Sequence, residues 1–218
     1  MNENKIYIMF QDRIEAGFQL AAKLKKYKNQ KGVILAVPRG GVPVAYVVAK
    51  ELGLPMEIVL TKKIGHPLNK EYAIGAASLT DYFIIPHENV SEEYIQAALQ
   101  SVRSRLKEMN TLFMGTNENE NLEGKTLIII DDGIATGNTI LGTVHLLRKR
   151  KPAKIIIAVP VASINAVEKL SREVDEVIAV VIPEEFYGVG AFYDDFGQVG
   201  DEEVLFYLHK LKEPGKTV

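Results

Sequence analysis

The chain has 218 residues, a formal net charge of −2 at pH 7 and no cysteine. This length supports an ample core, and we expect residues 1–218 to form a single α/β domain. The near-neutral charge argues against a nucleic-acid partner, and the lack of cysteine excludes disulfides and cysteine-held metals. The first residues lack the basic start and apolar run that are typical of a signal peptide, and no run reaches the roughly 18 apolar residues of a membrane span. We therefore expect a cytoplasmic protein without membrane contact.

The first predicted element is a helix that runs to about Lys28. Asp12, with an acid three residues later, is typical of an N-cap. Apolar spacing predicts a buried face that contains Ile14, Phe18, Ala21 and Leu24 and extends to Tyr27. Arg13 has two interpretations, a solvated surface residue or a contact to a phosphate or base.

The next unit is a buried strand over 33–37, followed by Pro38-Arg39-Gly40-Gly41 and a helix over 42–52. Paired glycines let a backbone approach a ligand closely, and the Arg39 guanidinium can fork onto phosphate oxygens. A tight turn without a ligand would explain the same four residues.

A strand over 56–60 leads into the basic segment 61–70. Its three lysines, glycine and proline predict a mobile loop rather than a packed element. Lys62 and Lys63 follow the strand end, where they could meet an anion, or they are solvated surface lysines.

A hairpin is predicted over 71–85, and Ser91 is expected to cap a helix that runs to about Met109. Basic residues on the exposed side of this helix are interpreted as a solvated face: Arg103, Arg105 and Lys107.

The segment 126–139 carries the clearest chemistry. A buried strand over 127–130 is followed by Asp131 and Asp132 and then by the glycine- and threonine-rich loop 133–139. Such a loop entering a helix suits a phosphate, which two adjacent acids would repel. The acids therefore point to sugar hydroxyls or a divalent cation, so the segment predicts a site for a ribose 5-phosphate. A polar turn with a helix cap explains the loop alone and leaves the acids without a purpose.

Two more buried strands are expected over 155–159 and 177–182, separated by a helix that Ser163 caps. The alternation predicts a parallel sheet with helices on both faces. The following segment 183–196 is rich in aromatics, glycines and acids. It suits a hood of about 183–200 in which aromatics stack on a flat ring, or an aromatic lid that fills the sheet end.

The segment 126–139 resembles the 5-phosphoribosyl 1-pyrophosphate (PRPP) signature of the type I phosphoribosyltransferases. That signature has four apolar residues, two acids and a loop ending Thr-Gly-x-Thr. The resemblance implies a Rossmann-like fold, a homodimer, and transfer of phosphoribose from PRPP to a nitrogenous base with Mg²⁺. It implies that Asp131 and Asp132 hold the ribose hydroxyls, directly or through metal-bound water. Residues implied for the 5-phosphate are Gly133, Ala135, Thr136, Gly137, Asn138 and Thr139.

The same resemblance assigns roles to the other motifs. Pro38, Arg39, Gly40 and Gly41 match the pyrophosphate loop, with a cis peptide between Pro38 and Arg39. The segment with Lys62 and Lys63 matches a loop that closes over PRPP and excludes water. The tail is similar to the base pocket of the hypoxanthine/guanine branch. This similarity implies base contacts by Phe186, Tyr187 and Asp194.

Two departures leave the acceptor base open. Ala135 stands where the hypoxanthine/guanine branch has an acid, and no lysine follows the strand over 155–159. Nearly the whole chain resembles a bacterial and archaeal branch of predicted phosphoribosyltransferases, marked by Asp12-Arg-Ile-Glu-Ala-Gly17. This resemblance does not identify the acceptor base. A regulator that senses PRPP or a nucleotide is the alternative. A nucleoside-triphosphate hydrolase is excluded because the chain lacks the Gly-x-x-x-x-Gly-Lys-Ser/Thr loop.

Overall fold

The computed structural model describes residues 9–70, 72–87, 90–114 and 121–212. Its main sheet has five parallel strands in the order β2-β1-β6-β7-β8. The apolar runs predicted every one of these strands to within two residues at either end. The strands are β1 (Gly32–Ala36), β2 (Met56–Ile58), β6 (Thr126–Ile130), β7 (Lys154–Val161) and β8 (Glu176–Val181).

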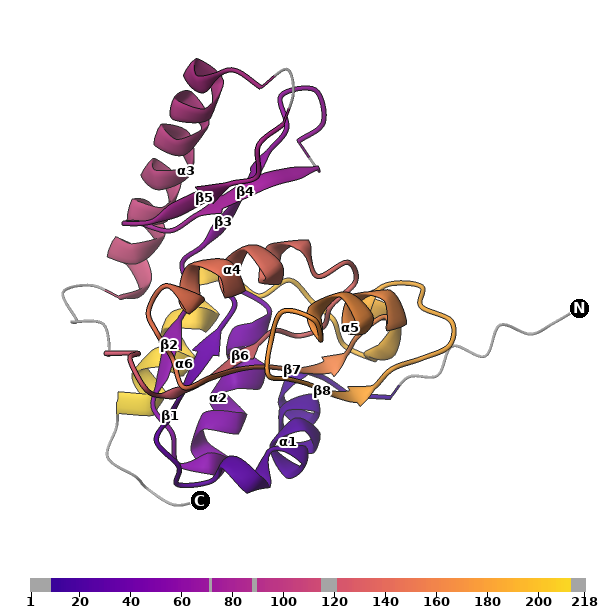
Figure 1. Ribbon diagram of the computed structural model, residues 1–218. Coiled ribbons are helices and arrows are strands. Elements are labelled where there is room, and N and C mark those ends of the chain that lie inside the picture. The colour runs from indigo at the N-terminus through magenta and orange to yellow at the C-terminus, as the bar shows by residue number, and fades with distance from the viewer. Residues whose placement is uncertain (1–8, 71, 88–89, 115–120, 213–218) are drawn as a thin grey trace, which may run out of the picture.

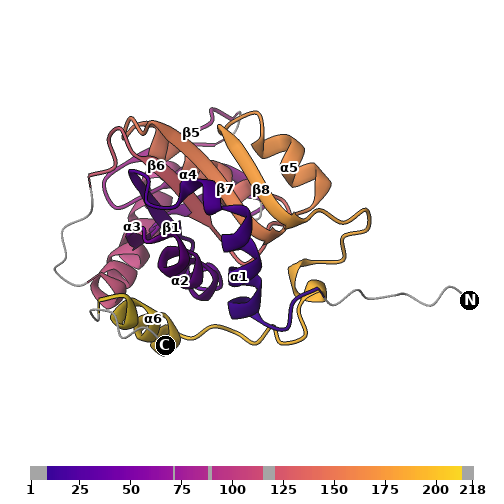
Figure 2. The ribbon, with the colours of Figure 1, turned by 90° about the horizontal axis from the view of Figure 1, so that it is seen from below.

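Helices cover both faces of this sheet (Figures 1 and 2). On one face lie α1 (Arg13–Lys23), α2 (Gly41–Leu52) and α6 (Asp201–Lys212), and on the other lie α4 (Asn138–Arg148) and α5 (Ile164–Leu170). Because side chains alternate along a strand, Ile128 and Ile130 join the first core and Leu127 and Ile129 the second. We call the sheet with these five helices the body.

A second layer lies above α4 in Figure 1. It is the antiparallel sheet β3-β4-β5 with the long helix α3 (Glu92–Phe113), and we call it the antiparallel layer. Its strands are β3 (Lys62–Gly65), β4 (Ala73–Ala77) and β5 (Tyr82–Ile84). The predicted fold class, a parallel sheet with helices on both faces plus a small hood, is confirmed, with this layer as the hood.

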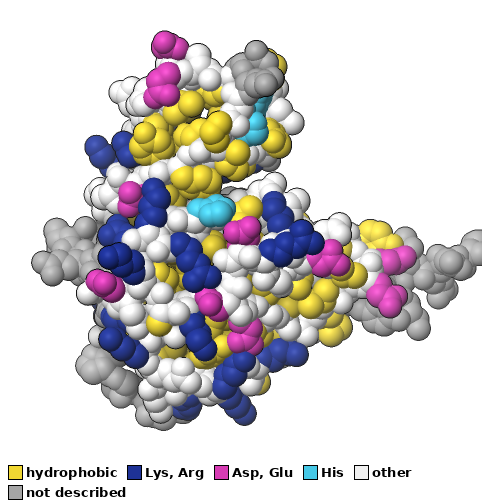
Figure 3. Space-filling model, in the orientation of Figure 1, with side chains coloured by type: hydrophobic (Ala, Val, Ile, Leu, Met, Phe, Trp, Pro, Cys, Tyr) yellow, Lys and Arg dark blue, Asp and Glu magenta, His cyan; other side chains and the backbone are white. Residues whose placement is uncertain are grey.

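The interpretation of residues 61–70 as an unpacked loop is wrong at Lys62–Gly65, which form β3. Ile64 is buried with Ile74 and Leu99, and β3 pairs along β4. Burial of Ile64 and the strand ladder outweigh the local turn formers. Apolar side chains also gather over the antiparallel layer on the face seen in Figure 3.

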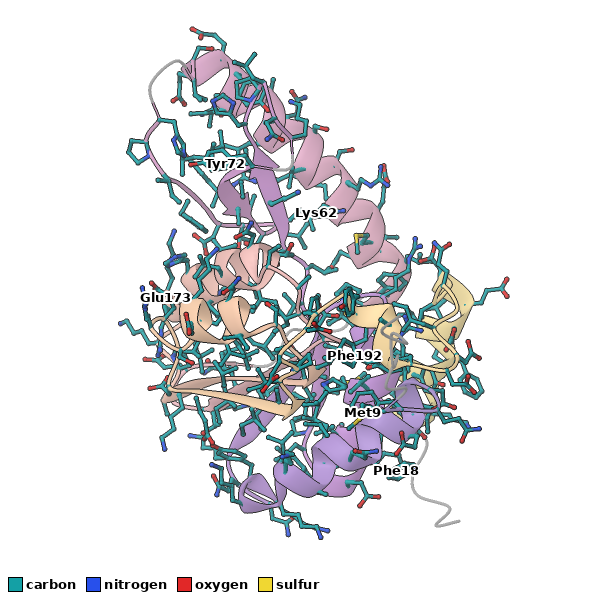
Figure 4. The ribbon with its side chains drawn as sticks, turned by 90° about the vertical axis from the view of Figure 1, so that its right-hand side faces the viewer. Met9, Phe18, Lys62, Tyr72, Glu173 and Phe192 are labelled. Atoms are coloured by element: carbon teal, nitrogen blue, oxygen red, sulfur yellow. The ribbon has the colours of Figure 1, made fainter. Side chains whose placement is uncertain are left out.

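The predicted buried face of the first helix is confirmed at Ala21, Leu24 and Tyr27, which are buried, but it is wrong at Phe18. Phe18 is 54% exposed and projects outward in Figure 4, whereas Ala16 and Leu20 are fully buried. The cause is close packing on α2, because a Cβ added to Gly17 would lie 2.8 Å from the Val47 Cβ. Small residues therefore face α2. The predicted cap is confirmed: the Glu15 N–H donates to Asp12 Oδ1 at 2.8 Å.

The segment after β8 returns to the start of the described chain. It contains the short helix η2 (Val189–Phe192), whose Phe192 carbonyl accepts the N–H groups of Met9 and Phe10, both at 3.0 Å. Figure 4 labels Met9 and Phe192 on this side of the body. That residues 183–200 act as a base-covering hood, within a single domain, stays a prediction. None of the helices in the described ranges is long and apolar enough to cross a membrane.

Candidate active site

The ends of β1 and β6 bring the two predicted motifs together. The Val37 N–H donates to the Ile130 carbonyl at 2.8 Å, and the next peptide but one, Pro38–Arg39, is cis as predicted. A Cβ on Gly40 would lie 2.1 Å from Asp132 Oδ2, and one on Gly41 would lie 2.6 Å from the Ile130 carbonyl oxygen. Only glycine permits this approach of the turn to the acidic pair.

Arg13 is part of this site, and its interpretation as a solvated residue is wrong. Its Nε and one terminal nitrogen each lie 2.9 Å from Asp132 Oδ2, and the other terminal nitrogen donates to the Gly197 carbonyl at 2.8 Å. The side chains of Arg13 and Asp132 are only 11% and 14% exposed. The guanidinium also lies 4.0 Å from the centre of the Phe196 ring. Arg13 therefore joins the N-terminal helix, the acidic pair and the C-terminal segment.

The two acids share one environment. The Asp132 N–H donates to Asp131 Oδ1 at 2.9 Å. Burial, and then the neighbouring Asp132 charge, raise the pKa of Asp131 well above its ordinary value. Burial also raises the pKa of Asp132, while Arg13 opposes that rise. The Tyr193 hydroxyl donates to the Asp132 carbonyl at 2.6 Å, and burial followed by the Asp132 charge raises its pKa.

The predicted phosphate loop is fixed to the neighbouring strand. The Ile134 N–H donates to the Val161 carbonyl at 2.9 Å, and the Ser163 hydroxyl donates to the Ala135 carbonyl at 2.6 Å. Gly137 caps α4 in the left-handed region, with φ of 70°. Ala135, Thr136 and Thr139 are exposed, while Gly133 packs against the Val189 side chain and Asn138 opens α4.

Lys169, on α5, is a residue near this loop that the sequence analysis missed. Its Nζ donates to the side-chain oxygen of Asn138, the first residue of α4. The loop 133–139 contains no basic residue of its own. Lys169 therefore adds positive charge beside the loop.

A cleft of about 1020 Å³ lies between the body and the antiparallel layer. Five of the predicted site residues line it: Pro38, Arg39, Gly40, Lys62 and Asp132. A second cavity, of about 560 Å³, is lined by none of the predicted site residues in the described part of the chain. The first cleft is therefore the candidate active site.

Cations enter this cleft from both layers. Arg39 Nε lies 2.7 Å from Asp201 Oδ1, and both side chains are about two-fifths exposed. Lys62 lies beside α3 (Figure 4), and its pKa is lowered first by burial and then by Arg105 and Arg39. Lys63 follows it in β3, where alternation points it to the other face, and it does not line the cleft.

None of the three residues predicted to contact the base is among the described residues that line the cleft. Phe186 stacks on Phe192 with ring centres 5.8 Å apart, and Tyr187 is 70% exposed. The Asp194 N–H donates to the Phe10 carbonyl at 2.9 Å, and its side chain is exposed. The tail instead lines the cleft through Val189, Phe196, Gly197, Gln198 and Val199. The tail therefore contributes to the cleft through other side chains than the three that were predicted, and its role in base binding stays a prediction.

Known proteins share both sequence and fold with this chain. The family model "phosphoribosyl transferase domain" matches residues 11–195. The Mycobacterium tuberculosis H37Rv protein named "putative phosphoribosyl transferase Rv0571c" is 33% identical over 207 residues, which are 93% of this chain and 47% of that protein. The chain thus spans about half the length of the curated relatives it matches.

Two solved structures are also similar. The protein TT1426 from Thermus thermophilus has a TM-score of 0.85 and 34% identity, covering 92% of this chain and 98% of that one. A hypothetical protein from Neisseria gonorrhoeae with bound ppGpp has a TM-score of 0.50 and 14% identity over 97% of this chain and 99% of that one. The second likeness shows the fold alone. Through the family match and the first fold, the chain belongs to the type I phosphoribosyl transferase domain family.

Proposed function

We propose that this domain transfers the 5-phosphoribosyl group of PRPP to a nitrogenous base, a purine or pyrimidine, and releases pyrophosphate. The observation that carries the proposal is the cleft, which gathers the pyrophosphate loop, Lys62 and Asp132 from separate parts of the chain. The fixed loop 133–139 lies directly after the acids. Together these parts suit a ligand with a pyrophosphate, a cis-diol and a 5-phosphate.

The acids would bind the sugar. Asp131 and Asp132 accept the hydrogen bonds of the ribose hydroxyls, and the backbone N–H groups and hydroxyls of Ala135–Thr139 hold the 5-phosphate. Lys169 contributes charge at that end. Arg13 keeps Asp132 directed over Gly40, so the acid faces the cleft with a fixed orientation.

The reaction breaks the bond between the anomeric carbon and the pyrophosphate oxygen, and the electron pair leaves with pyrophosphate. A ring nitrogen of the base then donates its lone pair to the anomeric carbon, and its proton passes to an oxygen of the released pyrophosphate. Arg39, Lys62 and the Gly40 and Gly41 backbone stabilise the charge that develops on pyrophosphate. The antiparallel layer, which carries Lys62, keeps water from the oxocarbenium-like centre. The methyl side chain of Ala135 cannot accept the base proton.

Mg²⁺ fits the carboxylate donors of this site. Among the described residues, no group of three or more His, Asp or Glu side chains could hold a metal ion alone. Asp131 and Asp132 would therefore share the ion with oxygens of PRPP, as Mg²⁺ sites commonly do. When bound, the ion neutralises charge on the pyrophosphate and ribose oxygens. We further propose a cytoplasmic homodimer, as in the family that the sequence resembles.

The test is pyrophosphate release from PRPP with Mg²⁺ across a panel of purines and pyrimidines. We expect release with one base, and a loss of at least about 100-fold in turnover for Asp132→Asn with the fold retained. Near-normal transfer by that variant would refute the role of Asp132. Tight PRPP binding without release on any base would instead favour the PRPP-sensing regulator.

A further inference from the structure

One stripe of α3 faces the cleft. Residues at spacings of three and four on a helix share a face, and four such residues line the cavity: Arg105, Glu108, Met109 and Leu112. A different stripe of α3 is buried and packs the helix in place, through Leu99, Leu106 and Phe113. The helix thus has a packed side and a side that forms a wall of the site.

Arg105 brings a further cation to the cleft. Arg39, Lys62 and Arg105 reach the cavity from the β1–α2 turn, β3 and α3. Arg39 is paired with Asp201, but Arg105 makes no hydrogen bond or ion pair with any described residue. After burial, the charges of Arg105 and then Arg39 lower the pKa of Lys62, so both arginines are close enough to repel the lysine. A polyanion in the cleft would relieve that repulsion.

We propose that Arg105 is a pyrophosphate-binding residue that α3 contributes to the transferase site. The guanidinium fork suits the oxygens of a pyrophosphate better than a single ribose hydroxyl. The 5-phosphate has its own anchored loop and Lys169, so Arg105 acts at the opposite end of PRPP. This inference rests on the proposed function, because it requires PRPP to occupy the cleft.

The test compares three ligands by titration calorimetry with Mg²⁺: PRPP, inorganic pyrophosphate and ribose 5-phosphate. We expect Arg105→Ala to weaken binding of PRPP and of pyrophosphate by roughly tenfold or more, and to leave ribose 5-phosphate unchanged. Lys107→Ala is the matched control, because Lys107 is an exposed cation of the same helix that does not line the cleft. It should leave all three affinities unchanged.

The outcomes separate the two proposals. If wild-type protein binds PRPP and Arg105→Ala binds it equally well, the inference about Arg105 fails and the proposed function stands. An equal loss for all three ligands would also overturn the inference, since it would indicate a general effect of charge. If the wild-type protein binds no PRPP, both proposals fall. Arg105 is exposed, so the variant should fold, and its thermal midpoint should match that of Lys107→Ala.

Discussion

The body and the antiparallel layer contribute to one cleft in different ways. In the body, Arg13 and Asp132 are nearly buried and touch each other, while Gly40 lies against the same carboxylate. In the antiparallel layer, Lys62 is half-buried, and the exposed Arg105 has no paired partner in the described chain. The body residues are fixed by contacts that also hold the fold. The layer residues present charge to the cleft.

This difference separates two kinds of variant. Removing Arg13 leaves a buried charge unpaired, and a side chain added at Gly40 forces a clash, so stability and activity should fall together in these two variants. Removing a cation from the antiparallel layer takes away only its attraction for a ligand. Ligand affinity should then fall while the free energy of unfolding stays within about 0.5 kcal/mol.

The largest effect is expected for Arg13→Ala. The change leaves the Asp132 carboxylate buried without its partner and also removes the contact with Phe196. We expect a loss of about 3 kcal/mol in the free energy of unfolding, or roughly 6–12 °C in the thermal midpoint. Chemical and thermal denaturation followed by circular dichroism would measure both.

A double variant serves as the control for Arg13. Arg13→Met with Asp132→Asn removes both charges, so it should recover much of the lost stability while remaining inactive. If Arg13→Ala alone unfolds like the wild type, the pair does not hold the body together.

The second largest effect is expected for Gly40→Ala. The new methyl group would have to displace the Asp132 carboxylate, which lies 2.1 Å from the ideal Cβ position. We expect turnover to fall about 100-fold, with a cost of about 1–3 kcal/mol in stability. Gly200→Ala is the control, because a Cβ there meets nothing within 4 Å. Equal turnover of the two variants would mean that the approach of Gly40 to Asp132 does not matter for transfer.

The sequence predicted the body better than the antiparallel layer, for a physical reason. Strands buried on both faces are continuous apolar runs, and caps such as Asp12 and Ser163 are local signals. In β3, by contrast, a single buried residue, Ile64, and pairing with β4 decide the structure. Such pairing depends on residues distant in sequence, and the lysines and glycine around Ile64 conceal it.

The candidate site shows the same difference between residues that local motifs reveal and residues that only long-range contacts bring to the site. Short sequence motifs contain Asp131, Asp132 and the turn at Gly40. These motifs indicate a ligand site even without knowledge of the fold. Arg13 and Arg105 reach the cleft only through packing of distant elements, and on their own helices they resemble ordinary surface cations. Which aromatics of the tail turn inward is likewise set by contacts of η2 with Phe10, and composition does not encode that choice.

A smaller effect, confined to ligand affinity, is expected for Lys62→Met. Methionine keeps the length and the apolar stem of the side chain and removes the charge. We expect PRPP affinity to fall roughly tenfold, measured by calorimetry, with the thermal midpoint unchanged or slightly raised. The sign follows from the lowered pKa of Lys62: the folded state disfavours its charged form, so neutralising it costs no stability below that pKa. A fall in stability comparable to that of Arg13→Ala would remove the distinction between the two regions.

The smallest expected effect, that of Asp131→Asn, is an increase in the free energy of unfolding rather than a loss. The pKa of Asp131 is raised in the folded protein, so its ionisation costs stability as the pH rises from about 4, the ordinary value for aspartate, through the folded-state pKa. Asp131→Asn removes that cost and can still accept the Asp132 N–H. We expect the variant to be about 1 kcal/mol more stable than the wild type at neutral pH and equal to it below about pH 4. Thermal unfolding across this pH range would test the crossover. A variant less stable than the wild type at pH 7 would mean that the Asp131 charge stabilises the fold. Keeping this acid ionised in the site would then cost the body no stability.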